Sequence, residues 1–138
     1  MGKLLERLRD ASRSGVYRVA RRDALDDALR GSGIDVAEVD LAGGNALEAL
    51  ARGLSFPAWF GNNWDALEDC LGDLSWRAGD AHLLVLAHAE RLAKDDLGVL
   101  LDVLRVSAEY WAGRAKPFFA VVIDPQALMP LPALHREP

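Results

Sequence analysis

Residues 56–71 read FPAWFGNNWDALEDCL, in which an aromatic, glycine and asparagine segment leads into a run with helical spacing. The apolar residues of this run recur at steps of three and four, which predicts a helix with one face in the core. These apolar residues are Trp64, Leu67, Leu71 and Leu74. The opposite face carries carboxylates and no base, and its members are Asp65, Glu68, Asp69 and Asp73.

The acidic face predicts a surface that meets positive charge. Asp65 lies in the first turn, where the helix dipole stabilises a carboxylate, but Asp69 and Asp73 gain little from the dipole and repel each other. Asn63 is suited to cap the helix through its side-chain oxygen. Any amphipathic helix can have a charged outer face, but the preceding aromatic loop favours a recognition patch.

Two large rings, Trp59 and Phe60, lie directly before Gly61 and two asparagines. This composition indicates a compact loop beside the helix, and we expect at least one ring to be exposed.

The segment WFGNNWDALEDCL at residues 59–71 resembles the barstar family, the intracellular protein inhibitors of barnase-type ribonucleases. The resemblance rests on the aromatic pair before glycine, the asparagine two residues later and the Asp-Ala-Leu-x-Asp-Cys-Leu helix. It implies that Asp65 and Asp69 enter a ribonuclease active site, where Asp69 replaces the scissile phosphate. Trp59 would occupy the place of an interface tyrosine. The partner-binding residues expected from the resemblance and the acidic face are Trp59, Gly61, Asn62, Asn63, Asp65, Glu68, Asp69 and Asp73.

The sequence departs from the family pattern in three places. Glu68 stands where the best-known member has a tryptophan, which removes apolar contact area and adds a charge. The last helix, LDVLRVSAEYW at 101–111, offers Glu109 as the nearest candidate for an interface acid. Residues 1–33 precede the part that the shortest members have. These departures keep open an alternative function, a barstar-like interaction module that regulates a partner other than a ribonuclease.

Composition and charge limit the classes of partner. The 138 residues are 51% hydrophobic, enough for one core, and the net charge is −5. Residues 1–30 hold eight bases and five acids, whereas residues 31–138 hold eight bases and sixteen acids. The acidic body would repel a phosphate backbone, so we expect no direct nucleic-acid binding. We expect a monomer before complex formation.

Cys70 is the single cysteine, which excludes an internal disulfide and fits a cytoplasmic protein. The acids around Cys70 disfavour a thiolate, so we expect a buried structural residue rather than a nucleophile. The N-terminus shows no long apolar run, cleavage site or acylation signal, so we expect no export, membrane span or anchor.

Two near-continuous apolar runs, HLLVLA at 82–87 and FFAVVI at 118–123, are typical of parallel strands covered by helices. Residues 96–111 between them have helical spacing, which predicts a right-handed crossover helix. The other expected elements are strands at 16–20 and 34–43, a helix at 23–30 ended by Gly31, and a helix at 46–54 that begins with an Asn45–Glu48 capping box. The pattern predicts a small three-layer α/β fold with a mainly parallel sheet and an extra N-terminal strand and helix.

We expect one domain, with an N-terminal extension at 1–33, a core at 34–124 and a C-terminal tail at 125–138. Four of the six prolines fall at or after Pro125, so we expect the tail to leave the fold as an extended segment, with packing on the surface as the alternative.

The sequence gives little support for phosphate binding, metal binding or catalysis. Gly43 and Gly44 lack the rest of a phosphate-binding motif and predict a turn. His82, His88 and His135 lack ligand spacing, so we expect structural or solvated histidines and no metal. Asp65 and Asp69 could form an acid and base pair or a magnesium site, because carboxylates four residues apart on a helix can converge, but the sequence places no apolar pocket or basic orienting partner beside either. We therefore expect a binding protein without a cofactor rather than an enzyme.

Overall fold

The computed structural model describes residues 2–135 and contains one four-stranded parallel sheet. The strands are β1 (Gly15–Val19), β2 (Asp35–Asp40), β3 (His82–Ala87) and β4 (Phe118–Ile123). Their order across the sheet is β1-β4-β3-β2, so the extra N-terminal strand lies at the edge beside β4. The two central strands, β4 and β3, are the two near-continuous apolar runs, which were predicted to be strands covered by helices.

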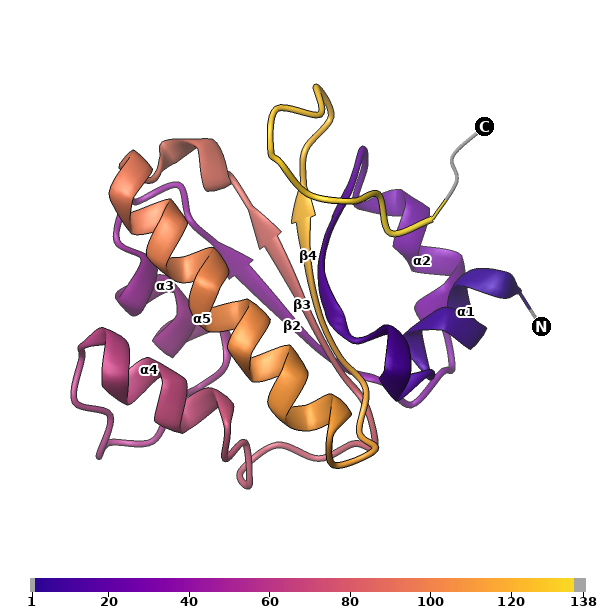
Figure 1. Ribbon diagram of the computed structural model, residues 1–138, viewed down its shortest axis with the longest axis horizontal. Helices are drawn as coiled ribbons and strands as arrows, with labels where there is room; N and C mark the ends of the chain where they lie inside the picture. The colour runs from indigo at the N-terminus through magenta and orange to yellow at the C-terminus, as the bar shows by residue number, and fades with distance from the viewer. Residues whose placement is uncertain (1, 136–138) are drawn as a thin grey trace.

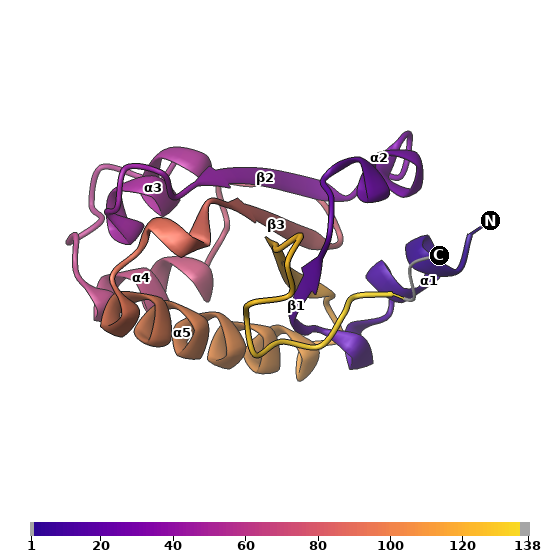
Figure 2. The same cartoon turned by 90° about the horizontal axis from the view of Figure 1, so that it is seen from above.

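Helices cover both faces of the sheet (Figures 1 and 2). On one face lie α3 (Ala46–Gly53), α4 (Trp64–Leu71) and α5 (Lys94–Ala112). On the other face lie α1 (Lys3–Leu8) and α2 (Asp23–Leu29). Two short 3-10 helices, η1 (Ala11–Arg13) and η2 (Ala89–Arg91), complete the secondary structure of residues 2–135. The small three-layer α/β fold expected from the sequence is confirmed.

Each face of the sheet has its own hydrophobic core. Leu84 and Phe118 belong to the core under α3, α4 and α5, whereas Leu83 and Phe119 belong to the core under α1 and α2. Because successive strand residues point to opposite faces, a strand covered on both sides needs apolar residues at nearly every position.

The ends of the predicted elements shift by a few residues. The strand expected at 34–43 is confined to β2, because a turn follows it, in which Gly44 has a φ of +80°. Asn45 caps α3 by accepting a hydrogen bond from the backbone nitrogen of Glu48 at 3.1 Å. Gly31, with a φ of +68°, follows α2 as expected.

The described part of the C-terminal tail packs against the fold instead of leaving it, so the expectation that it leaves is wrong and the alternative of packing is correct. It crosses the outer edge of β1, where the backbone nitrogen of Arg18 donates to Pro132 and the carbonyl oxygen of Arg18 accepts from Leu134. Leu131 is buried in the core on the α5 side and Leu134 in the core on the α1 side. Residues 136–138 lie outside the described residues.

A largely buried charge cluster joins the start of β2 to the connection between α4 and β3. Arg77 donates two hydrogen bonds to Asp35, at 2.7 and 2.8 Å, and Nδ1 of His82 lies 2.8 Å from the same carboxylate. Burial lowers the pKa of His82, although Asp35 opposes the shift. Burial would raise the pKa of Asp35, but the bonds from Arg77 and His82 hold it below its ordinary value. The cluster fixes the chain that follows α4.

Candidate functional site

The acidic helix α4 begins at a capped and sharply bent loop. Asn63 Oδ1 accepts a hydrogen bond from the backbone nitrogen of Ala66 at 2.8 Å, which confirms the predicted cap. Its Nδ2 lies 3.4 Å from the carbonyl oxygen of Gly61, and Asn62 adopts a φ of +55°. Asparagine tolerates this left-handed conformation better than most residues. Gly61, Asn62 and Asn63 are all exposed, so the loop presents its polar side to solvent.

The apolar face of α4 packs into the core. Leu67 and Leu71 are fully buried and Trp64 is partly buried against the same cluster. Trp111 of α5 donates a hydrogen bond from Nε1 to the carbonyl oxygen of Leu71 at 2.7 Å. The predicted core face is therefore confirmed, and α5 holds the end of α4.

The opposite face exposes Asp65, Glu68 and Asp69 to solvent. Within the part of the chain that the structure describes, none of these carboxylates forms an ion pair. Their charges are therefore available to a partner without the loss of an internal bond.

The predicted fourth acid of the helix is not helical. The helix ends at Leu71, and Asp73 lies in the following turn, where its backbone nitrogen donates to Cys70. Leu74, buried as expected, has a φ of +52°, which is incompatible with continued helix. Asp73 is still exposed, so the acidic row extends one turn past the helix.

An aromatic cluster holds the loop before α4. Trp59 is 58% exposed and meets Trp76 edge to face at 6.2 Å between ring centroids. Trp76 in turn donates from Nε1 to the carbonyl oxygen of Leu54, and Phe60 packs on Phe56. The expectation of one exposed ring is confirmed, and that ring is Trp59.

A hollow of about 300 Å³ lies between α4 and α5. Its lining residues are Glu68, Asp69, Gly72, Val106, Ser107 and Tyr110. Glu109 is exposed but does not line the hollow, whereas Val106 and Tyr110 do. The sequence analysis missed these two residues. The available signal was that apolar residues at positions 99, 106 and 110 lie outside the core-facing side of α5.

Comparison with protein families finds that residues 34–123 match the family described as Barstar (barnase inhibitor). This segment covers well over half of the chain and contains β2, α3, α4, β3, α5 and β4. The chain belongs to the Barstar family. Comparison with curated proteins gives no significant match.

The Barstar match includes the exposed acids of α4, the Trp59 loop and the hollow. The family is one of inhibitors rather than enzymes, and its description names barnase as the protein inhibited. The first strand and helix lie outside the matched residues, yet β1 pairs with β4 of the Barstar segment over five residues. This N-terminal addition therefore widens the family's sheet and lies on the side away from α4 (Figure 1).

Cys70 lies on the buried side of α4 and is fully inaccessible. Burial raises the pKa of its thiol, and the charges of Asp73 and Asp69 add to the shift. The expectation of a buried structural cysteine is confirmed.

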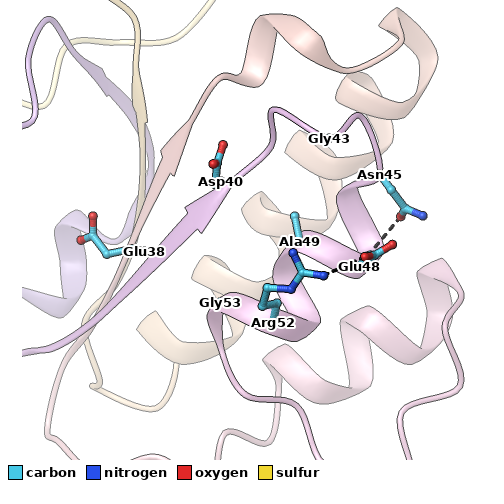
Figure 3. Close-up of a pocket in the computed structure, with 8 residues that line it drawn as sticks. All are labelled: Glu38, Asp40, Gly43, Asn45, Glu48, Ala49, Arg52 and Gly53. Atoms are coloured by element: carbon cyan, nitrogen blue, oxygen red, sulfur yellow. Dashed lines mark hydrogen bonds and ion pairs between the residues drawn. The ribbon is translucent and has the colours of Figure 1, made fainter.

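A second hollow lies between β2 and α3 and is also lined by acids (Figure 3). Each acid already has a basic partner: Glu38 binds Arg22, Asp40 lies 2.8 Å from Nδ1 of His88, and Glu48 binds Arg52. Among the described residues, the acids of this hollow are therefore paired, whereas Asp65, Glu68 and Asp69 of α4 are not.

Within residues 2–135, no group of three or more histidine, cysteine, aspartate or glutamate side chains is placed to hold a metal ion. None of the helices in that range is both long and apolar enough to cross a membrane.

Proposed function

We propose that this chain is a cytoplasmic inhibitor that binds a barnase-type ribonuclease or a ribonuclease toxin and blocks its active site. The observation that carries the proposal is the exposed row of unpaired carboxylates on α4, held beside an exposed tryptophan in a chain of the Barstar family. Such an inhibitor would protect the cell that produces the ribonuclease.

The mechanism is mimicry of phosphate by carboxylate. A ribonuclease cleft binds the RNA backbone with cationic side chains, and a carboxylate can accept the same charge-assisted hydrogen bonds. Asp69 would occupy the position of the scissile phosphate, and Asp65 would bind a neighbouring cation. The cap at Asn63 and the bond from Trp111 to Leu71 support this role, because a fixed helix loses little freedom on binding.

The loop at residues 59–63 would contact the ribonuclease at the periphery of the interface. Trp59 is exposed but is held by Trp76, so it offers a large apolar area at a small entropic cost. Gly61, Asn62 and Asn63 lie between this ring and the acidic row, and we include them in the proposed interface.

The deciding experiment is titration of a barnase-type ribonuclease with this protein while RNA cleavage is measured. We expect stoichiometric loss of cleavage with the parent and recovery of cleavage with the Asp65→Ala, Asp69→Ala double variant. A matched control is the Asp27→Ala, Glu90→Ala double variant, which removes the same charge from exposed positions outside α4 and should still inhibit.

A second candidate function is a Barstar-type interaction module that regulates a partner other than a ribonuclease. Two observations favour it: Glu68 adds a charge at the centre of the acidic row, and the hollow receives no acid from α5. Absence of inhibition in the titration would exclude the ribonuclease tested and favour this function.

A further inference from the structure

The two walls of the hollow between α4 and α5 have different chemistry. The α4 wall presents Glu68 and Asp69, whose carboxylates are exposed and unpaired within the described residues. The α5 wall presents Val106 and Tyr110, which are 48% and 42% exposed. Charge and apolar area therefore lie side by side in a space of about 300 Å³.

The α5 residues that line the hollow carry no negative charge. Nearby on α5, Asp102 lies 3.1 Å from Nη1 of Arg105, and Glu109 is exposed but does not line the hollow. The guanidinium of Arg114 lies over the ring of Tyr110, 4.5 Å from its centroid. Arg114 already occupies one face of this ring, so a second cation brought against Tyr110 would be repelled by the guanidinium.

The exposed apolar area is concentrated on this side of the molecule. Large exposed apolar residues in the described chain number five, of which three lie on α5 and one in the loop before α4: Trp59, Val99, Val106, Tyr110 and Leu128. Val99, Val106 and Tyr110 are spaced seven and four residues apart, so they follow one side of α5. An apolar strip that continues into a charged recognition face is typical of a protein interface.

We propose that the ribonuclease bound by this protein seats an apolar side chain in the hollow, directly beside the cations that meet Glu68 and Asp69. The apolar side chain packs on Val106 and Tyr110, and Gly72 leaves room for it at the end of α4. This inference rests on the proposed function and specifies the partner: its contact surface is cationic opposite α4 and apolar opposite α5. A ribonuclease with arginine or lysine opposite α5 would be a poor partner.

The test is a selection from a library. A catalytically inactive barnase-type ribonuclease is displayed on phage, its active-site cations are kept, and the surface residues that border its cleft are randomised. Selection is run against the parent protein and against the Val106→Glu, Tyr110→Glu double variant. We expect the parent to enrich leucine, methionine and aromatic residues at one bordering position, and the double variant to enrich arginine and lysine there.

The binding affinity of the selected ribonuclease for variants of this protein then separates the apolar contact in the hollow from the inhibitor function. Tyr110→Ser, which keeps a small polar residue at an exposed site, should weaken binding by about tenfold or more at both low and high salt. Leu128→Ser, which removes an exposed apolar side chain outside the hollow, should bind as the parent does. Circular dichroism of each variant confirms that it is folded.

Enrichment of arginine or lysine by the parent, or the same enriched residues with both baits, would overturn the inference. If binders with no apolar preference still depend on Asp65 and Asp69, the inference fails while the inhibitor function stands. If no library member binds, or if binding does not depend on Asp65 and Asp69, both proposals fail.

Discussion

The indole nitrogen of Trp111 donates a hydrogen bond to the carbonyl oxygen of Leu71 across 2.7 Å, and this bond ties the last residue of α4 to the end of α5. Carbonyl oxygens in the last turn of a helix have no partner within the helix, so this bond satisfies a group that would otherwise need water. Because the two residues are far apart in sequence, the bond fixes the acidic row of α4 relative to the apolar strip of α5.

Substitution of Trp111 by phenylalanine should lower the free energy of unfolding by roughly 1–2 kcal/mol, because the hydrogen bond to Leu71 is lost together with part of the packing of the larger indole ring. Urea denaturation followed by circular dichroism measures this change. The matched control is Tyr110→Phe at the adjacent exposed position, which should leave stability within about 0.5 kcal/mol of the parent. Equal effects of the two substitutions would show that the bond contributes nothing measurable.

Substitution of Asp69 by alanine should raise the off-rate of an inhibited ribonuclease by roughly 30-fold or more, equivalent to about 2 kcal/mol, with a much smaller change in the on-rate. The physical reason is that Asp69 would be desolvated at the centre of the contact, so its loss leaves cations of the partner unpaired. Surface plasmon resonance gives both rates. Equal changes in the two rates would contradict the central position of Asp69.

The comparison variant for Asp69→Ala is Glu68→Gln, which removes a charge from the same face and keeps the shape of the side chain. Glu68→Gln should mainly lower the association rate, and mainly at low salt, because long-range attraction is screened as ionic strength rises. Abolition of binding by Glu68→Gln would instead make Glu68 a central contact.

Local sequence was sufficient to predict the central strands and the start of α4. The runs at 82–87 and 118–123 coincide with β3 and β4, since their length and near-continuous apolar sequence are typical of strands covered on both faces. The cap at Asn63 was equally predictable, because a cap depends on residues that are adjacent in sequence. The exposed acids of α4 followed directly from its helical spacing.

Long-range packing decided the features that sequence reasoning missed. Leu74 continues the apolar spacing of α4, yet the chain turns after Leu71 and reaches Leu74 through a left-handed conformation. The hollow depends on how α5 lies against α4, which is set by the contact of Trp111 with Leu71. Prolines in the tail predict an extended chain, but they do not reveal that Leu134 fits a core formed by α1, α2 and the sheet.

Substitution of Leu134 by alanine should destabilise the protein by about 2–5 kcal/mol, because the side chain is fully buried and its removal leaves a cavity between the tail and the sheet. The matched control in the same tail is Leu128→Ala, which should change stability by less than about 0.5 kcal/mol, since Leu128 is 68% exposed. Chemical denaturation of the two variants measures the difference. A small effect at Leu134 would mean that the tail is not part of the folded core.

The stability of the protein should fall as the pH is lowered from 7 to 5, and His82 should account for part of that loss. His82 is buried, and burial lowers its pKa in the folded state even though the carboxylate of Asp35 opposes the shift. Lys116 and Arg77 also disfavour its charged form. An unfolded chain binds the proton at the ordinary histidine pKa of about 6.5, so below that pH the unfolded state holds more protons and gains stability relative to the folded state.

The lowered pKa of Asp35 acts in a separate and more acidic range. Its contribution to stability is present above the ordinary aspartate pKa of about 3.9 and is lost only as the pH falls through the lower value of the folded state. Urea denaturation at pH 7 and pH 5 therefore isolates the histidine. His82→Gln should show a smaller loss between the two pH values than the parent, whereas His88→Gln, at a half-exposed position beside Asp40, should retain the loss. An undiminished loss in His82→Gln would show that other groups cause the pH dependence.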